Sequence, residues 1–243
     1  MATHPTTTAE QGQSPSGTVP HTAPLYVDFL CYRLEPAFRR LPVADRQRGV
    51  GEFITAVRQH ERHQTIRPYV SLGLRSEVDL VLWAIAPDVA RFQALVADLA
   101  RTGLGQYLTL SYAFLALRKA SPYSSNHPQA FEANLPPRKY LFLYPFVKSR
   151  DWYLAPMEQR RAMMQEHTGI GSRFPSVRIN TTYAFGLGDQ DFVLAFEADE
   201  PQDFEDLVQA LRESQASRYT VRDTPMIVAA FKPLDDALQG LGV

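Results

Sequence analysis

The chain has little cysteine, little net charge and no long apolar run, and each shortage excludes a class of protein. Cys31 is the single cysteine, so no intramolecular disulfide can form, and its apolar surroundings predict a free buried thiol. A formal net charge of -1 over 243 residues indicates no nucleic-acid partner and no affinity for a membrane surface. No segment reaches the roughly 18 apolar residues of a membrane helix, and no signal-peptide pattern opens the chain. These absences predict a cytoplasmic protein.

The sequence signatures of several common enzyme sites are also missing. The chain contains no G-x-G-x-x-G, no Walker loop, no G-x-S-x-G and no C-x-x-C. Nucleotide binding, α/β-hydrolase chemistry and thiol redox chemistry therefore have no support in the sequence. Residues 1–23 are rich in Thr, Ser, Pro and Gln and almost free of apolar side chains, which predicts a disordered tail.

The chain does contain an internal duplication. From residue 25 onward, apolar periodicity predicts the order strand, helix, strand, strand, helix, strand, and the same order then repeats. Residues 79–99 align with residues 191–211 without a gap. The matched pairs are Asp79 and Asp191, Val81 and Val193, Leu82 and Leu194, Phe92 and Phe204, Leu95 and Leu207, Val96 and Val208, and Leu99 and Leu211.

Two β-α-β-β-α-β units predict an α+β fold made of two ferredoxin-like halves, residues 24–118 and 138–243. We expect their sheets to pack together or to close into a barrel of the dimeric α+β type, with the helices outside. Residues 119–137 connect the halves. This connector is rich in Pro and Ser but also carries aromatic residues and His127, so we expect it to fold over something.

His167 lies on the apolar side of a helix predicted over residues 156–167, which Gly169 is expected to stop. Pattern alone leaves two interpretations. One is a core or helix-end histidine whose charge suits the helix dipole. The other is a metal ligand. No cluster of ligand residues surrounds it at zinc spacing, whereas haem iron needs one protein ligand and an apolar slot.

Three further residues have ordinary interpretations when periodicity alone is considered. Tyr144 reads as a buried strand tyrosine, and Lys148 reads as a lysine at a solvated strand end. His127, in the connector, reads as a histidine of a surface loop. The last strand is predicted over residues 218–231.

Five motifs together resemble the chlorite-dismutase-like haem proteins, closest to their coproheme decarboxylases of the actinobacterial type. They are Y-P-F-V-[KR]-S at 144–149, D-W-Y-L-x-P at 151–156, the histidine of "EHTGIG" at 166–171, V-R-x-N-T at 177–181 and L-A-F-E-A-D-E at 194–200. The specific matches cover about 70 residues, and a weaker likeness extends over residues 24–232.

The resemblance implies two ferredoxin-like halves per chain, a homopentamer, and haem in the C-terminal half. It implies that His167 is the proximal iron ligand and that coproheme is both cofactor and substrate. In such enzymes hydrogen peroxide oxidises the iron, and two propionates lose carbon dioxide to become the vinyl groups of haem b. Tyr144 matches the tyrosine that carries a radical, and Lys148 and Trp152 match residues that bind the cofactor.

The resemblance also bears on the distal side of the iron. His127 of "HPQAF" lies 17 residues before Tyr144, as does the distal base of the actinobacterial type, and imidazole titrates near neutral pH. Ile179 falls where chlorite dismutases have arginine and other decarboxylases glutamine. Strand alternation should turn Arg178 to the opposite face, but a one-residue gap leaves open which of the two faces the iron. Gln215 falls near the carboxylate that usually orients the proximal histidine, which implies a weaker imidazole donor.

Three functions are compatible with these residues. Peroxide-dependent decarboxylation of coproheme to haem b accounts for Tyr144, Lys148 and His127 together. Chlorite dismutation needs the distal arginine that Ile179 replaces. A non-catalytic haem-binding or haem-transfer protein would accommodate Gln215 and the divergent connector.

Overall fold

The computed structural model describes residues 24–123, 129–133 and 135–242. The predicted tail, residues 1–23, and the connector residue His127 lie outside these ranges. The first half contains β1 (Tyr26–Leu34), α1 (Pro36–Arg39), α2 (Val43–Glu61), β2 (Thr65–Val70), β3 (Leu80–Ala86), α3 (Ala90–Ala100), the 3₁₀ helix η1 (Gly105–Tyr107) and β4 (Leu108–Leu117).

The second half repeats this order with additions. It contains β5 (Tyr140–Lys148), α4 (Arg150–Leu154), α5 (Met157–Gly171), β6 (Arg178–Tyr183), β7 (Phe192–Ala198), α6 (Pro201–Arg212), the 3₁₀ helix η2 (Gln215–Tyr219), β8 (Thr220–Arg222), β9 (Ile227–Phe231) and α7 (Leu234–Gln239). Each half therefore has the predicted ferredoxin-like element order.

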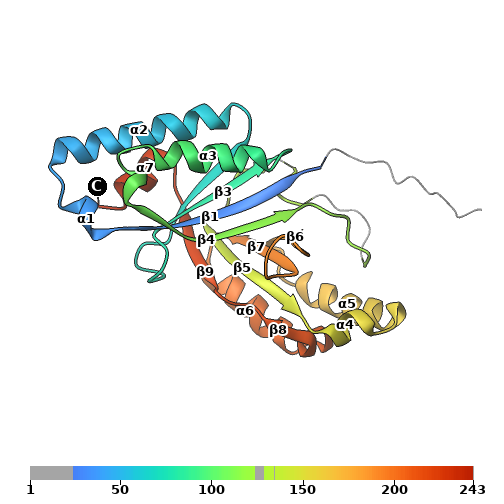
Figure 1. The fold of residues 1–243 in the computed structure, drawn as a ribbon. Coiled ribbons are helices and arrows are strands. Elements are labelled where there is room, and N and C mark those ends of the chain that lie inside the picture. Colours follow the sequence, from blue (N-terminus) through green and yellow to red (C-terminus); the bar gives the residue numbers. More distant parts are fainter. Residues whose placement is uncertain (1–23, 124–128, 134, 243) are drawn as a thin grey trace, which may run out of the picture.

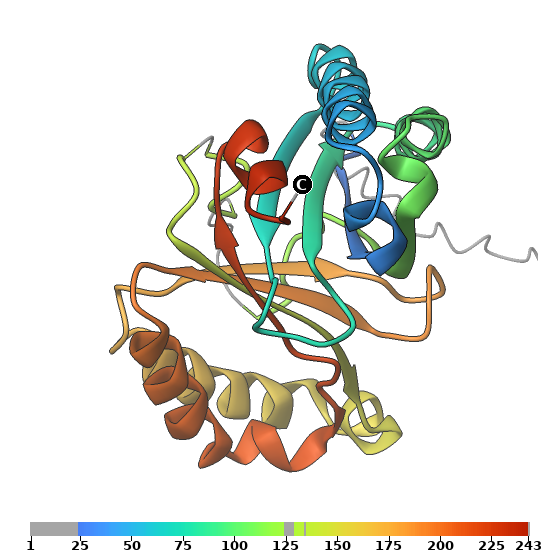
Figure 2. The same ribbon diagram turned by 90° about the vertical axis from the view of Figure 1, so that its left-hand side faces the viewer.

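In the described residues the strands form one antiparallel sheet in the order β7-β6-β4-β1-β3-β2-β9-β5-β8, and a further β7–β5 pairing closes it into a barrel. The halves join where β4 meets β6, at Leu117 and Tyr183, and where β2 meets β9. Figures 1 and 2 show α2, α3 and α7 on one side of the barrel and α4, α5 and α6 on the other. The prediction of two ferredoxin-like halves in an α+β barrel is confirmed.

Alternation along the strands divides the apolar side chains among separate cores. The barrel interior contains the inward side chains of both halves, such as Phe29, Trp83 and Leu143. The outer face of the first half packs against α2, α3 and α7 in a large cluster. The outer face of the second half packs mainly against α6, in a smaller cluster.

The structure differs from the sequence-based prediction at two boundaries. Helix α5 does not stop at Gly169 but runs to Gly171, because a glycine inside a helix costs only about 1 kcal/mol and the Ser172 backbone N–H still bonds to the Thr168 carbonyl. The predicted last strand is broken into β8 and β9. Pro225 lies in the break and has no N–H for the strand ladder.

Candidate functional site

The second half leaves the helix side of β6 and β7 partly uncovered. Five side chains on this side of the two strands are not fully covered, and we call their positions the open face. They are Ile179, Thr181, Tyr183, Phe192 and Leu194, and all are exposed or half-buried. The sheet register assigns each a counterpart in the first half, because Leu82 and Leu194 align in the repeat. The counterparts, in the same order, are Ile66, Pro68, Val70, Leu80 and Leu82, and all five are buried.

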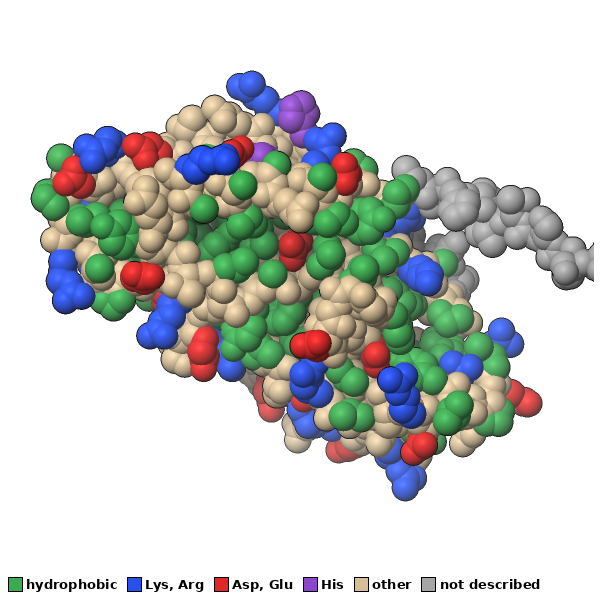
Figure 3. All heavy atoms as spheres, in the orientation of Figure 1, with side chains coloured by type: hydrophobic (Ala, Val, Ile, Leu, Met, Phe, Trp, Pro, Cys, Tyr) green, Lys and Arg blue, Asp and Glu red, His purple; other side chains and the backbone are tan. Residues whose placement is uncertain are grey.

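Helix α5 lies beside this face without covering it. Its main packing partners are α6 and η2 rather than a strand, and Met163 is its one buried residue. Its C-terminal end does reach β6, since a Cβ on Gly171 would lie 3.9 Å from Cδ1 of Ile179. Figure 3 shows hydrophobic side chains gathered above the lobe formed by α4 and α5. Apolar side chains are therefore exposed here, and a flat apolar ligand could pack against them.

His167 occupies a position that carries phenylalanine in the first half. Helices α2 and α5 both follow a proline N-cap of nearly identical backbone angles, Pro42 and Pro156. Counted from these prolines, Phe53 and His167 stand at the same place, and Phe53 is fully buried. The repeat therefore replaces a core side chain with an imidazole, one helical turn before Gly171, the α5 residue that lies next to Ile179.

The His167 ring is half-buried, and its Nδ1 is buried without a hydrogen-bond partner among the described residues. Burial lowers the pKa of the imidazole, the nearby Lys148 ammonium lowers it further, and Glu166 opposes both. The ring is therefore neutral at neutral pH, which is the form that binds a metal. In the described residues no group of three or more His, Cys, Asp or Glu side chains could hold a metal ion.

Lys148 ends β5 and points its ammonium group inward rather than into solvent. Its Nζ donates to the Ala216 carbonyl at 2.5 Å and lies 4.6 Å from the centre of the Trp152 ring and 5.3 Å from that of Phe146. Burial lowers its pKa to about 8. A partly desolvated cation of this kind favours an anionic ligand.

Tyr144 shares the helix side of the sheet with the open face, since it pairs with Leu194 across β5 and β7. Its ring stacks on Phe196 with centroids 5.8 Å apart, and it is buried. Burial raises the pKa of the phenol well above its usual range. The hydroxyl therefore stays protonated throughout the physiological pH range.

Trp152 lies in α4 and is buried in a small cluster with Met163 and Ala216. Its ring makes edge contacts with Tyr219 and Tyr123, at centroid distances of 5.5 and 6.0 Å. The indole thus forms the surface on which the Lys148 ammonium rests.

Arg178 and Ile179 point to opposite sides of β6. Ile179 is 44% exposed and belongs to the open face. Arg178 turns away and donates from Nη1 to the Pro136 carbonyl at 2.6 Å. Of the two residues that the sequence left open, Ile179 is the one on the face beside His167.

The described parts of the connector lie along the margin of the open face. Tyr123 accepts a hydrogen bond from Arg160 of α5 at 3.1 Å. Further along, the Gln129 side-chain carbonyl accepts from the Thr181 backbone N–H at 2.8 Å. These contacts cover the edge of β6, which pairs with β4 only at Tyr183.

Gln215 does not serve as a side-chain partner of His167. Its side-chain carbonyl accepts from Arg218 at 3.3 Å, and its backbone N–H donates to Glu166 at 3.0 Å. Among the described residues the imidazole Nδ1 therefore has neither the carboxylate partner that the resemblance implies nor the amide that replaces it in sequence.

Sequence reasoning missed a polar network behind β6, centred on Glu197 and Asn180. Glu197 is fully buried on the inner side of β7, where the repeat alignment has Ile85 in the first half. A glutamate that replaces an apolar residue at an inward position of a strand is a signal that the sequence does contain. Its partners lie far apart in the chain, so only the fold reveals them.

The pattern of the chlorite dismutase family matches residues 46–232. The chain belongs to the chlorite dismutase family. It is 37% identical over 184 residues to the coproheme decarboxylase of Mycolicibacterium smegmatis, covering 74% of this chain and 80% of that protein. It is 25% identical over 230 residues to the chlorite dismutase of Ideonella dechloratans, covering 90% and 80%.

Solved structures of the family have the same architecture. A mutant chlorite dismutase from Candidatus Nitrospira defluvii superimposes with a TM-score of 0.83 at 26% identity, covering 90% of this chain and 96% of that one. The chlorite dismutase of that organism in complex with imidazole gives the same TM-score. In the described part of the chain, no helix has both the length and the apolar character needed to span a bilayer.

Proposed function

We propose that this chlorite dismutase family member converts coproheme to haem b by hydrogen peroxide-dependent oxidative decarboxylation, a step of haem biosynthesis. The observation that carries the proposal is that the Lys148 ammonium lies close enough to His167 to lower its pKa, while Tyr144 pairs with Leu194 of the open face. Coproheme decarboxylases are among the relatives of this chain, at 37% identity in one case and 24% in another.

The residues of the site suit an iron porphyrin. The open face offers the apolar, flat surface that a macrocycle needs, and burying its side chains would stabilise the complex by about 25 cal/mol for each Å² removed from water. His167 supplies one neutral nitrogen ligand, which is all that a porphyrin iron requires from a protein. The Lys148 ammonium offers a charge partner for a propionate.

The overall reaction balances with one peroxide for each propionate. A –CH₂–CH₂–COOH group becomes a vinyl group and carbon dioxide and gives up two hydrogen atoms, which convert one H₂O₂ into two H₂O. The bound iron porphyrin supplies the redox chemistry that draws oxidising power from peroxide. The protein must hold the propionate beside a group that removes hydrogen, and must supply and take up protons.

Tyr144 is the group we assign to hydrogen removal. Its phenol is kept neutral by burial, so it loses an electron and a proton together rather than ionising first. The resulting phenoxyl radical would take one hydrogen atom from the propionate side chain and return to phenol. The second electron would pass to the bound iron porphyrin as carbon dioxide leaves, and the carboxyl proton would pass to solvent. Stacking on Phe196 fixes the ring while this occurs.

Lys148 is assigned to holding a propionate. With a pKa of about 8 the ammonium is mostly protonated at neutral pH, and an approaching carboxylate would favour the charged form further. The contact of the ammonium with the Trp152 ring orients the lysine side chain. Trp152 can therefore contribute to the cofactor site through Lys148, without itself contacting the porphyrin.

His127 is assigned to taking a proton from peroxide on the distal side. It lies outside the described residues, so its role rests on the family motif. The supporting observation is that Gln129, two residues further along the chain, bonds to Thr181 on the open face. The homopentamer and the cytoplasmic location implied by the resemblance and the composition also stay predictions.

The position of Ile179 favours decarboxylation over chlorite dismutation. An aliphatic side chain cannot provide the cationic donor that the resemblance implies for chlorite chemistry, and Arg178 is bonded to Pro136 on the far side of β6. The unpartnered Nδ1 of His167 is the one observation that suits a non-catalytic haem-binding protein.

One experiment separates these functions. The protein is loaded with ferric coproporphyrin III, titrated with hydrogen peroxide, and followed by mass spectrometry of the porphyrin. We expect the stepwise loss of two carboxyl groups, with haem b as the product. A porphyrin that binds but keeps all four propionates would favour the non-catalytic alternative, and oxygen release from chlorite would favour dismutation.

A further inference from the structure

Glu197 is a buried carboxylate at a position where the first half of the barrel needs none. It lies on the inner side of β7 and is 0% exposed. Moving an ionised carboxylate out of water costs several kcal/mol unless partners satisfy it. The first half has Ile85 at the corresponding place, so barrel packing alone does not require the charge.

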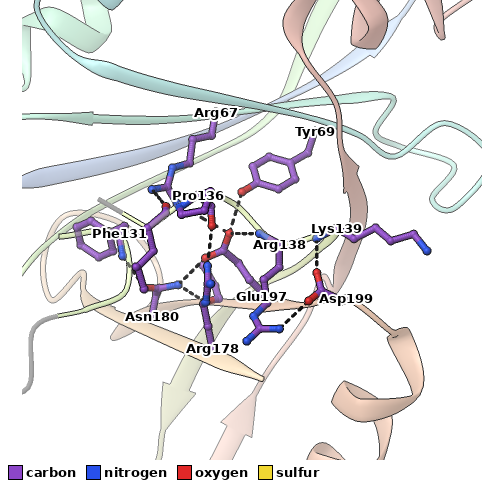
Figure 4. A network of polar contacts seen from close by, with 12 residues as sticks. Arg67, Tyr69, Phe131, Pro136, Arg138, Lys139, Arg178, Asn180, Glu197 and Asp199 are labelled. Atoms are coloured by element: carbon purple, nitrogen blue, oxygen red, sulfur yellow. Dashed lines mark hydrogen bonds and ion pairs between the residues drawn. The ribbon is translucent and has the colours of Figure 1, made fainter. Parts of the chain in front are cut away.

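The partners of Glu197 come from both halves and include Arg138, the first residue after the connector (Figure 4). Its Oε1 accepts from the Tyr69 hydroxyl at 3.3 Å and from the Arg138 backbone N–H at 3.3 Å, and Arg67 Nη1 lies 3.8 Å away. Its Oε2 accepts from Asn180 Nδ2 at 3.4 Å. One carboxylate therefore joins β2, β6 and residue 138.

Two of these partners also hold the connector. Arg67 Nη2 donates to the Leu135 carbonyl at 3.1 Å, and the Phe131 backbone N–H donates to Asn180 Oδ1 at 3.2 Å. The Arg67 guanidinium is further fixed over Trp83, 5.1 Å from the ring centre. Figure 4 shows the Arg67 and Asn180 side chains next to Glu197, with Asn180 also reaching toward Phe131 of the connector.

Strand β6 stands between this network and the open face. Asn180 points inward to Glu197, while its neighbours Ile179 and Thr181 belong to the open face. The Thr181 backbone N–H is itself bonded to the connector residue Gln129. A substitution at Asn180 should therefore displace both β6, which carries Ile179 and Thr181 of the open face, and the connector.

We propose that Glu197 is a positioning residue: through Asn180 and Arg67 it fixes β6 and the connector in the one arrangement that the reaction on the open face requires. The inference rests on the proposed function in that the open face receives an iron porphyrin. Glu197 lies on the side of β7 opposite the open face, so its effect passes through the residues that it holds.

The main test is Glu197→Gln, which keeps the shape of the side chain and removes the charge. We expect coproheme affinity to change by less than about 3-fold, whereas peroxide kcat/KM and the association rate of cyanide with the ferric complex fall roughly 10- to 100-fold, the usual result of a small misplacement near a reacting centre. The matched control is Asp199→Asn. That carboxylate directly follows β7 and is exposed, and its hydrogen-bond partners among the described residues are Arg138 and Lys139, so no rate should change.

A merely structural role would lower the melting temperature and leave cyanide association unchanged in the folded protein, and that result would overturn the inference. If Glu197→Gln does not fold, Asn180→Ala serves instead, because it breaks the link to β6 and to Phe131 but keeps Arg67 beside Glu197. The double variant Glu197→Gln with Asn180→Asp returns one carboxylate to this network, hydrogen-bonded to residue 197, and should recover at least part of the rate.

The outcome is separable from that of the proposed function. A wild-type protein that binds coproheme without decarboxylating it would refute the proposed function. The association rates of cyanide with the ferric wild type and with the Glu197→Gln variant could still be compared, so the positioning role of Glu197 would still be tested. Hydrogen exchange of the porphyrin-free protein gives a second readout. We expect faster exchange in residues 129–138 and in β6 for Glu197→Gln and none of this for Asp199→Asn. Unchanged exchange in both would also count against the inference.

Discussion

The two halves of the barrel share one strand pattern but cover their outer sheet faces differently. Leu82 and Leu194 align in the repeat, yet Leu82 is fully buried and Leu194 is partly exposed. Ile66 is 7% exposed, whereas Ile179, at the same register position, is 44% exposed. Because the residue types are the same, the difference arises in the elements that cover the strands.

The covering elements differ in number and in composition. In the first half α7 packs beside α2 and α3 on the sheet and adds side chains such as Leu238 to the core. In the second half α5 contributes one buried residue, and His167 stands where α2 has Phe53. In this duplicated fold one copy leaves its sheet face open, where the candidate site lies, while the other copy covers the same face with packed helices.

The largest expected effect comes from Tyr144→Phe, which makes the site more like the first half, where Leu30 occupies the matching position. Only a hydroxyl is lost, so the stacking on Phe196 and coproheme affinity should persist. Carbon dioxide release on addition of peroxide should fall to background, as measured by gas analysis and porphyrin mass. Full conversion to haem b would end the assignment of hydrogen removal to Tyr144.

The distal assignment predicts the next largest effect. His127→Ala should slow the reaction with peroxide by roughly 10²- to 10⁴-fold at neutral pH, the usual loss for a general base. In the wild type the rate should drop as pH falls through about 6.5, because the protonated imidazole cannot accept a proton. Arg178→Ala, on the far side of β6, is the matched comparison and should change the rate little. Stopped-flow rates showing the reverse would place Arg178 at the iron.

His167→Phe restores the first-half residue at the matching helix position. We expect the ferric complex to lose its histidine-ligated absorption spectrum while retaining part of its porphyrin affinity, since Lys148 and the open face remain. The porphyrin-free protein should become more stable by about 1 kcal/mol, because a buried unpartnered nitrogen is removed. An unchanged ferric spectrum would show that another residue binds the iron.

A matched pair of leucines measures the packing difference directly. Leu82→Ala should lower the free energy of unfolding by about 2–5 kcal/mol, because it leaves a cavity in a closed core. Leu194→Ala should cost about 1 kcal/mol in the porphyrin-free protein, because the side chain is already partly in water. Urea denaturation of both variants gives the two values. Equal costs would mean that the open face is closed in solution.

The last effect concerns a polar group in the packed half, and it is a change in the pH dependence of stability alone. Burial raises the pKa of Asp28 to about 7, and its Oδ1 has no hydrogen-bond partner among the described residues. A carboxyl whose folded pKa is raised favours folding below its unfolded pKa of 3.8 and loses that contribution as pH rises to about 7. Asp28→Asn should therefore gain roughly 1–3 kcal/mol relative to wild type between pH 4 and pH 8. Parallel pH dependences of stability in the two proteins would contradict this.

Much of the fold was predictable because it follows from local patterns and from repetition. The alignment of residues 79–99 with 191–211 predicts two equivalent halves, and β3–α3 and β7–α6 occupy those segments. Helix ends were predicted less well. Gly169 is a weak breaker, and its local cost was offset by backbone bonds that continue to Ser172.

The sequence by itself determined the duplication, the single histidine on the apolar side of α5 and the alternation that separates Arg178 from Ile179. All three depend on spacing along the chain, which the residues carry directly. Only the tertiary structure decided that Leu194 is open while Leu82 is closed, and that Glu197 meets Arg67 and Asn180. Burial and long-range pairing depend on which distant segments arrive at a position. Two leucines in identical local sequence patterns can therefore differ in burial, as Leu82 and Leu194 do.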